Sequence, residues 1–139
     1  MEYSLENMEV YQQAETFSDI IWNLVDKWNQ FQKDTIGKQI TRSADSISVN
    51  IAEGYGRFYY KESKQFYFYS RGSLLETTAW LSKCKRRGLI EISKADELIN
   101  HTEKLLLKLN AFILRHKSCF QENTSIFLSF QPSASATFE

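Results

Sequence analysis

The sequence is poor in the residues that interrupt helices. Among 139 residues there are one proline and five glycines. Proline lacks a backbone donor and glycine is conformationally permissive, so both are rare inside helices and common in turns. Their scarcity predicts long regular elements with short connections, and the length is typical of one domain.

Cysteine and histidine are equally scarce, with two residues of each. Cys84 and Cys119 have neither a metal-ligand spacing nor a disulfide framework, which indicates a reducing compartment. No run approaches the roughly 18 apolar residues of a membrane span. The N-terminus also lacks the basic and apolar regions of a signal peptide. We therefore expect a cytoplasmic protein without a membrane partner.

No charge of one sign dominates, because 17 basic residues balance 17 acidic residues. Proteins that coat nucleic acid normally carry a large positive net charge, so this balance argues against such a coat. A balanced net charge is still compatible with a local basic patch.

What the sequence does contain is helical periodicity in four segments. We expect helices over about 5–29, 36–54, 61–87 and 93–117, the last from its apolar residues at steps of three and four. The first segment carries a heptad seam made of Val10, Ala14, Phe17, Ile21, Leu24, Trp28 and Phe31. Short connections between such helices predict an all-α fold, a single up-down-up-down four-helix bundle over residues 1–117.

The connections and the C-terminal segment are predicted from composition. Gln30 to Thr35 is expected to be a loop, and Gly54, Gly56 and Gly88 are expected to stop helices. Residues 118–139 contain the only proline and show no helical period, which favours a mostly disordered tail. An alternative is a short extended segment over 126–130, lying on the bundle or on a neighbouring subunit.

A polar stripe runs beside the apolar stripe of the second predicted helix. The apolar stripe is Ile36, Ile40, Ala44, Ile47 and Ile51, and the polar one is Gln39, Ser43, Ser46, Asn50, Glu53 and Arg57. Short polar side chains in this position are typical of a half-buried contact with another helix. There, a buried polar group without a partner would cost about 1–3 kcal/mol.

The same stretch resembles a known family. Arg42-Ser43-Ala44, Ser46-Ile47 and Asn50-Ile51-Ala52-Glu53-Gly54, with Arg57 beyond, are similar to the signature of the bacterial four helix bundle proteins, also called 23S rRNA intervening-sequence proteins. Arg71-Gly72-Ser73-Leu74 with Glu76 resembles the family's second signature. The resemblance covers about residues 5–117. It implies ring-shaped homopentamers without an established activity, and a related retroelement protein binds nucleic acid.

The two motifs define a predicted structural site at an oligomer contact: Arg42, Ser43, Ser46, Asn50, Glu53, Arg57, Arg71, Ser73 and Glu76. We expect Ser46, Asn50 and Glu53 to form hydrogen bonds across to Arg71 and so to fix how the second and third helices meet. Gly72 lies inside the third predicted helix at a cost of about 1 kcal/mol relative to alanine. Close packing of a neighbouring helix is its predicted justification.

Basic residues gather near the ends of the first and third predicted helices. Alternating helix directions would bring together Lys27, Lys33, Lys83, Lys85, Arg86, Arg87 and Lys94. One interpretation is a solvated helix end whose cations complement the helix dipole. The other is a phosphate-binding patch in which Lys83, Lys85, Arg86 and Arg87 contact RNA or DNA.

The residues that carry catalysis or hold metals are poorly placed. A di-metal bundle needs Glu-x-x-His pairs, but Leu98 precedes His101 and Ile113 precedes His116 at that spacing. No P-loop occurs, and no histidine lies in the polar stripe to act as a base. We expect no cofactor and a non-enzymatic, self-assembling scaffold that binds nucleic acid or a protein partner. The alternative is a small enzyme or ligand-binding protein that uses Glu53 and the arginines of the stripe.

Overall fold

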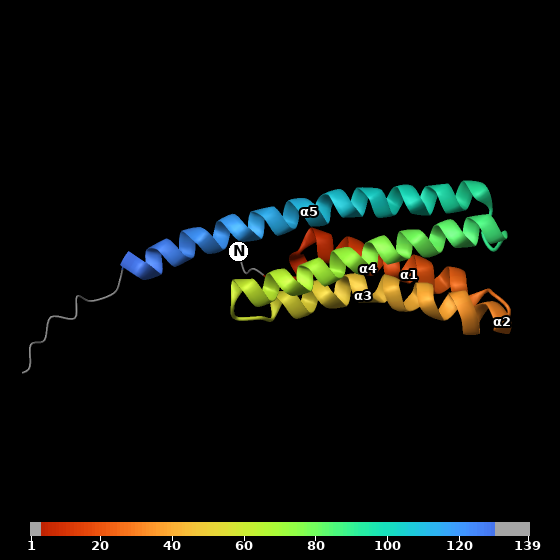
Figure 1. The fold of residues 1–139 in the computed structure, drawn as a ribbon, viewed down its shortest axis with the longest axis horizontal. Coiled ribbons are helices and arrows are strands. Elements are labelled where there is room, and N and C mark those ends of the chain that lie inside the picture. The colour runs from red at the N-terminus through yellow and green to blue at the C-terminus, as the bar shows by residue number, and fades with distance from the viewer. Residues whose placement is uncertain (1–3, 130–139) are drawn as a thin grey trace, which may run out of the picture.

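Four long antiparallel helices form the molecule. The computed structural model describes residues 4–129, and the side chains of residues 4–116. The long helices are α1 (Glu9–Asp26), α3 (Lys38–Tyr55), α4 (Tyr60–Arg87) and α5 (Ile92–Ser129), and a 3-10 helix, η1 (Leu5–Asn7), precedes α1. They lie side by side along one axis (Figure 1). The predicted all-α four-helix bundle is confirmed.

The core lies between the four helices, and each contributes one stripe to it. Its largest fully buried side chains include Phe17, Ile21, Ile40, Ile47, Ile51, Tyr67, Leu74, Leu81, Leu98, Leu105 and Leu109. All five apolar residues predicted for the second helix are buried. Phe31 was expected in the seam of the first helix, but its side chain is exposed because α1 ends at Asp26.

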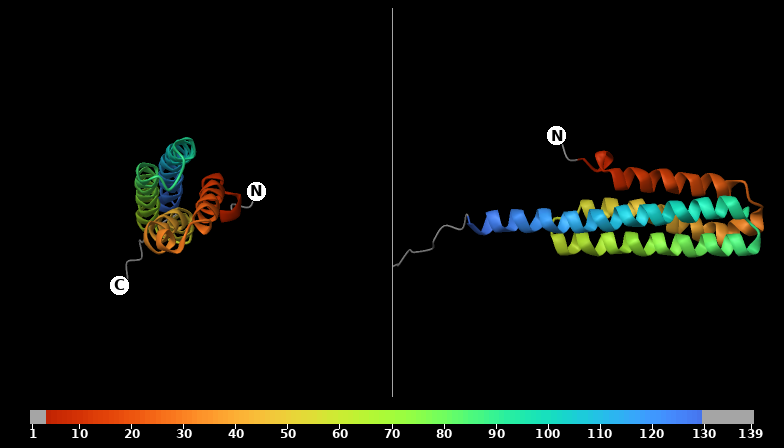
Figure 2. Two further views of the ribbon diagram at one scale, coloured as in Figure 1. Left: turned by 90° about the vertical axis from the view of Figure 1, so that its right-hand side faces the viewer. Right: turned by 90° about the horizontal axis from the view of Figure 1, so that it is seen from above.

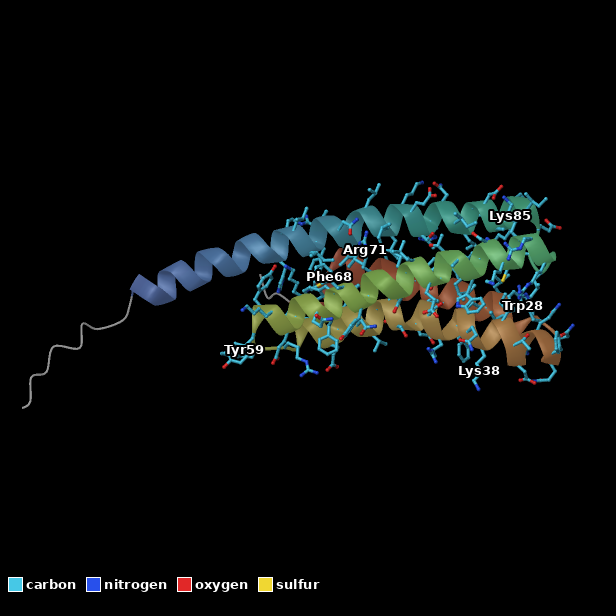
Figure 3. All side chains as sticks on the ribbon, viewed as in Figure 1. Trp28, Lys38, Tyr59, Phe68, Arg71 and Lys85 are labelled. Carbon is cyan, nitrogen blue, oxygen red and sulfur yellow. The ribbon has the colours of Figure 1, made fainter. Side chains whose placement is uncertain are left out.

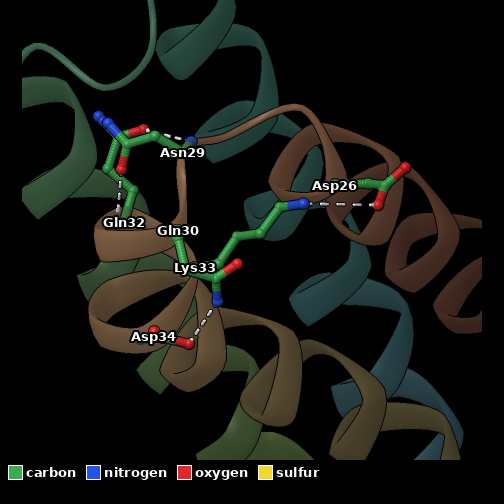
Figure 4. A network of polar contacts seen from close by, with 6 residues as sticks. All are labelled: Asp26, Asn29, Gln30, Gln32, Lys33 and Asp34. Carbon is green, nitrogen blue, oxygen red and sulfur yellow. Dashed lines mark hydrogen bonds and ion pairs between the residues drawn. The ribbon is translucent and has the colours of Figure 1, made fainter.

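The predicted loop at Gln30 to Thr35 is wrong, because the chain is helical again from Gln30. The short α2 (Gln30–Gln32) and a π-helical turn, η2 (Lys33–Gly37), lead directly into α3. Asn29 caps this start, since its Oδ1 accepts from the Gln32 N–H at 2.9 Å while Gln32 Oε1 accepts from the Asn29 N–H at 3.2 Å. Figure 4 shows this capping box beside the Gln30–Asp34 hydrogen bond and the Lys33–Asp26 ion pair.

Two glycines have roles different from those predicted. Gly54 does not stop a helix: α3 runs to Tyr55 with Gly56 after it, and Gly54 is buried. A Cβ at Gly54 would lie 2.5 Å from Tyr67 Cε1 and 2.9 Å from the carbonyl oxygen of Ser63. Gly72, for which close packing was predicted, is exposed, and a Cβ there would meet nothing within 4 Å. The close approach between α3 and α4 therefore occurs at Gly54.

The two ends of the α4–α5 pair differ. Gly88 ends α4 as predicted, with a φ of 74° in the left-handed region that glycine tolerates. The helix end predicted at Lys117 is too early, since α5 continues to Ser129. Neither glycine nor proline occurs between Ile92 and Ser129, so no residue there breaks the helix. The division into a bundle over 1–117 and a tail over 118–139 stays a prediction, and residues 130–139 lie outside the described part of the chain.

The last part of α5 projects beyond the bundle. Figures 1 and 2 both show this helix running on past the α3–α4 turn, where the other long helices have ended. The opposite end of the bundle carries α2 and the α4–α5 turn. The molecule thus has two distinct ends, and each contains a candidate interaction site.

Candidate interaction sites

A buried polar junction joins α3 to α4. The hydroxyl of Thr77 donates to Ser43 Oγ at 2.9 Å, and the Ser70 hydroxyl donates to the carbonyl oxygen of Ile47 at 2.7 Å. Ser43, Ser70 and Thr77 are all buried. The predicted half-buried contact of the polar stripe therefore exists at Ser43, although its partner is Thr77. Because a buried hydroxyl without a partner is costly, this junction restricts the register of the two helices.

The other short polar residues of the stripe bond within their own helix. The Ser46 hydroxyl donates to the carbonyl oxygen of Arg42 at 2.7 Å, and the Asn50 amide donates to that of Ser46 at 2.8 Å. Arg71 Nε donates to Asn110 Oδ1 on α5 at 3.0 Å. Figure 3 shows Arg71 between α4 and α5. The predicted bonds from Ser46, Asn50 and Glu53 to Arg71 are therefore wrong, because Arg71 lies on the side of α4 that faces α5.

The remaining motif residues lie near solvent. Glu53 and Arg57 form an ion pair with 49% and 40% of their side-chain areas exposed. The Arg57 guanidinium also lies 4.6 Å from the centre of the Phe66 ring. Arg42 and Glu76 are exposed, whereas Ser73 is partly buried. The structure thus does not gather the predicted site residues into one pocket.

An open groove of about 500 Å³ lies between α1 and α3. Arg42 lines it together with Trp22, Lys38 and Asp45. Partial burial, with the nearby carboxylates of Glu15 and Asp19, raises the pKa of Asp45 above its usual range. Glu53 does not line this groove, so the groove does not unite Glu53 with the arginines of the stripe.

Groups suited to nucleophilic or metal chemistry are few. Burial raises the pKa of the Cys84 thiol to about 11. The thiol is therefore protonated at neutral pH, and a protonated thiol is a weak nucleophile. Among the side chains described, those of residues 4–116, no three histidine, cysteine, aspartate or glutamate residues lie together in a way that would hold a metal ion.

Basic residues gather at one end of the bundle, where α2 and the α4–α5 turn lie (Figures 1 and 3). We call this the basic end; it comprises Lys27, Lys33, Lys83, Lys85, Arg86, Arg87 and Lys94. Three of these lysines pair with carboxylates: Lys85 with Asp96 at 2.6 Å, Lys94 with Glu97 at 3.3 Å and Lys33 with Asp26 at 3.9 Å.

Three of the four basic-end cations without an ion pair in residues 4–116 come from the end of α4, and the fourth, Lys27, follows α1. Arg86 and Arg87 are exposed, and neither forms an ion pair with another residue in the range 4–116. Lys83 Nζ lies 5.8 Å from the centre of the Trp80 ring. The sequence indicated this convergence of charge, but it did not reveal which carboxylates would neutralise part of it.

The opposite end of the bundle exposes aromatic side chains that the sequence analysis missed. Phe58 and Tyr59, in the turn between α3 and α4, have 84% and 65% of their areas exposed, and their rings lie edge to face at 5.1 Å. Figure 3 shows Tyr59 directed away from the bundle. We call this pair the aromatic end. The signal was present in the sequence, since Phe58-Tyr59-Tyr60 is an apolar run at a predicted turn.

Behind the aromatic end, ring contacts join α4 to α5. The Tyr60 ring stacks on His116 with centroids 6.0 Å apart, and Tyr67 meets His116 edge to face at 5.1 Å. Phe112 packs against Tyr67 at 4.9 Å. Burial lowers the pKa of His116, so the neutral imidazole is favoured in this apolar surrounding.

None of the helices in residues 4–129 is long and apolar enough to cross a membrane. No curated protein matches this chain. Among solved structures, the chain is similar to a protein of unknown function from the S23 ribosomal protein family of Bacteroides thetaiotaomicron. The two share 23% identity with a TM-score of 0.68, over 75% of this chain and 97% of the other. This likeness shows the four-helix fold.

The family is shown by the sequence itself. The family model described as 23S rRNA-intervening sequence protein matches residues 6–111, which include both motifs and all four long helices in whole or in part. The match spans most of the chain and agrees with the bundle and with the resemblance carried by the motifs. The chain belongs to the 23S rRNA-intervening sequence protein family.

Proposed function

We propose that the protein is a cytoplasmic, non-enzymatic helical scaffold that assembles with itself and binds nucleic-acid phosphates at its basic end. One observation favours the basic end as the binding surface. Arg86 and Arg87 are exposed at the end of α4 without a carboxylate partner in residues 4–116, whereas the neighbouring Lys85 is paired. Phosphate oxygens are suitable partners for such free guanidinium groups.

Self-assembly would make this small patch effective. A single chain has no net charge and offers few uncompensated cations, so one copy would bind a strand weakly. A homo-oligomer repeats the patch and raises the effective concentration of each further contact. The homopentameric ring implied by the family resemblance is one such arrangement. Since the family description refers to 23S rRNA, RNA is the first nucleic acid to test.

The test is binding of fluorescent single-stranded RNA and DNA, measured by anisotropy across a range of salt concentrations. We expect affinity to fall steeply between about 50 and 200 mM salt, because bound phosphates release counterions. Replacing Lys83, Lys85, Arg86 and Arg87 together by glutamine should weaken binding to every sequence. A matched control replaces four exposed cations outside both the basic end and the predicted oligomer contact by glutamine: Lys38, Lys61, Lys104 and Lys108.

Two results would count against nucleic acid as the ligand. One is no salt-dependent binding at low ionic strength. The other is an equal loss of affinity in both quadruple variants, which would indicate only a response to total charge. A protein partner would then be the next candidate, sought by affinity capture and mass spectrometry. The alternative of a ligand-binding or enzymatic site has less support, since the Glu53–Arg57 pair is exposed and Glu53 does not line the groove between α1 and α3.

A further inference from the structure

The outer face of the α4–α5 pair carries an exposed apolar patch. Phe68 and Leu75 come from α4, and Leu107 and Leu114 come from α5. Their exposed fractions run from 44% at Leu75 to 71% at Leu107. Within each helix the two residues are seven positions apart, so they share one face. Large apolar side chains grouped on a surface are typical of an interaction site.

The patch surrounds one hydrogen bond between the two helices. Arg71 Nε on α4 donates to Asn110 Oδ1 on α5 at 3.0 Å. Figure 3 shows Phe68 and Arg71 on the side of α4 that faces α5. An open groove of about 350 Å³ runs along this contact, and the residues that line it include Phe68, Arg71, Asn110 and Leu114. The apolar side chains therefore border a groove that is open to another molecule.

The two helices carry apolar residues at the same offsets from this hydrogen bond. Phe68 and Leu107 each lie three residues before the bonded residue of their own helix, whereas Leu75 and Leu114 each lie four residues after it. These offsets correspond to about 4.5 and 6 Å along a helix. Because α4 and α5 are antiparallel, the patch extends almost equally in both directions along the bundle and can therefore face a copy of itself.

Charge selects one orientation of two such copies. Lys64 lies seven residues before Arg71, and Glu103 lies seven residues before Asn110, so the patch has a cation at one end and a carboxylate at the other. Neither charge forms an ion pair within residues 4–116. Parallel copies would bring their two lysines to the same end of the contact. Antiparallel copies bring each Lys64 to the same end as the partner's Glu103, where opposite charges attract.

We propose that two copies of this chain pair antiparallel through their α4–α5 faces, with the two-fold axis at the Arg71–Asn110 hydrogen bond. Phe68 of each copy packs against the partner's Leu75, and Leu107 packs against the partner's Leu114. The same surface is then buried on both copies, as two-fold symmetry requires. The occupant is a second copy because the patch itself supplies the apolar side chains and both charges of the contact.

The inference rests on the self-assembly in the proposed function and specifies the surface that carries it. Arg71 lies sixteen residues before Arg87 on the same helix. This separation is about 24 Å at about 1.5 Å per residue. The interface is thus centred away from the basic end, and antiparallel pairing places the two basic ends at opposite ends of the pair.

The first test is the mass of the full-length chain, measured by light scattering coupled to size exclusion. Leu107→Glu places a charge in the proposed contact and should halve the mass of the assembly. Val49→Glu is the matched control, because Val49 is also an exposed aliphatic residue but lies on α3. The control should leave the mass unchanged. Both positions are exposed, so circular dichroism should show the helicity of the unaltered chain in both variants.

The second test reverses the two charges. Lys64→Glu and Glu103→Lys each place like charges at both ends of the contact. Each should raise the dissociation constant at low salt by roughly 3–10-fold, measured from the mass over a dilution series. The double variant has opposite charges at each end again, and its dissociation constant should return to nearly that of the unaltered chain.

The outcomes separate the two proposals. If the unaltered chain is monomeric at all concentrations, self-assembly is wrong and this interface is wrong with it. If the chain assembles but Leu107→Glu keeps the full mass, self-assembly stands and this interface is wrong. If Val49→Glu halves the mass as well, added charge and not the α4–α5 face causes dissociation, which also refutes the interface. A double charge reversal that does not restore association refutes the antiparallel pairing.

Discussion

Replacing Gly54 by alanine should destabilise the bundle, whereas replacing Gly72 by alanine should stabilise it. The contact between Gly54 and Tyr67 is the reason for the difference. Gly54 faces α4, and an added Cβ would lie 2.5 and 2.8 Å from two ring carbons of Tyr67. It would also lie 2.9 Å from the Ser63 carbonyl oxygen, which is backbone and cannot rotate away. Gly72 lies on the solvent side of α4, where a Cβ would meet nothing within 4 Å.

Overpacking a core typically costs about 1–3 kcal/mol. Alanine in a helix interior gains about 1 kcal/mol over glycine, and this gain applies at both positions. The clash at Gly54 is with a fully buried ring and with backbone, so we expect it to exceed the gain. Gly54→Ala should therefore lower the free energy of unfolding by up to about 2 kcal/mol, whereas Gly72→Ala should raise it by up to about 1 kcal/mol.

Urea denaturation followed by circular dichroism measures both changes in free energy, and thermal melts should agree with a shift of roughly 4 °C per kcal/mol for a chain of this size. The two variants make the same chemical change in the same kind of element, so each is the control for the other. If Gly54→Ala proves as stable as Gly72→Ala, the close approach of α3 to Tyr67 is wrong.

Three further predictions follow from the site geometry. Glu53→Ala removes only an exposed pair and should change the free energy of unfolding by no more than about 0.5 kcal/mol in denaturant titrations, with an unchanged oligomer mass. Thr77→Val removes the donor to Ser43 and should cost about 1 kcal/mol, an effect that a double-mutant cycle with Ser43→Ala should show to be shared. His116 has a lowered pKa in the folded protein, so the unfolded chain binds its proton more readily. Unfolding free energy should therefore fall as pH drops below the ordinary histidine value of about 6.5, level off below the lowered pKa, and lose this dependence in His116→Phe.

The sequence predicted the bundle because apolar spacing reports directly on which face of a helix is buried. The same reasoning would have placed Gly54 correctly. It follows Ile47 and Ile51 at steps of four and three, and so it lies on the buried stripe, whereas Gly72 lies off the stripe of Ser70, Leu74 and Thr77. Interpreting both glycines by residue type alone, without their position on the helix, produced both errors.

The loop predicted at Gln30 to Thr35, where the structure is helical, was wrong for a different reason. Residues 30–35 lack an apolar period, and this lack favoured a loop. Asn29 followed three residues later by Gln32 was nevertheless a capping-box pattern, and the structure forms both of its hydrogen bonds. The capping pattern was thus the better indicator of where the helical segment begins.

The partners of the polar residues were beyond what spacing can predict. Arg71 and Ser70 are adjacent in sequence but about 100° apart around α4. The rotation of that helix in the bundle therefore decides whether Arg71 meets α3 or α5. The structure turns Ser70 toward α3 and Arg71 toward Asn110 on α5. Rotation depends on packing of the whole core, so the motif indicated that a polar contact exists without identifying which residues make it.

Truncation after Lys117 tests whether residues 118–139 are needed for the bundle to fold. Within residues 4–116 the last buried residue is Ile113, and the ring contacts described there reach His116, so the truncation keeps every core contact described for residues 4–116. The shortened chain should therefore keep a cooperative melt, followed by circular dichroism, at nearly the melting temperature and helicity of the full chain. A truncated protein that fails to fold would show instead that residues 118–139 belong to the core of the bundle.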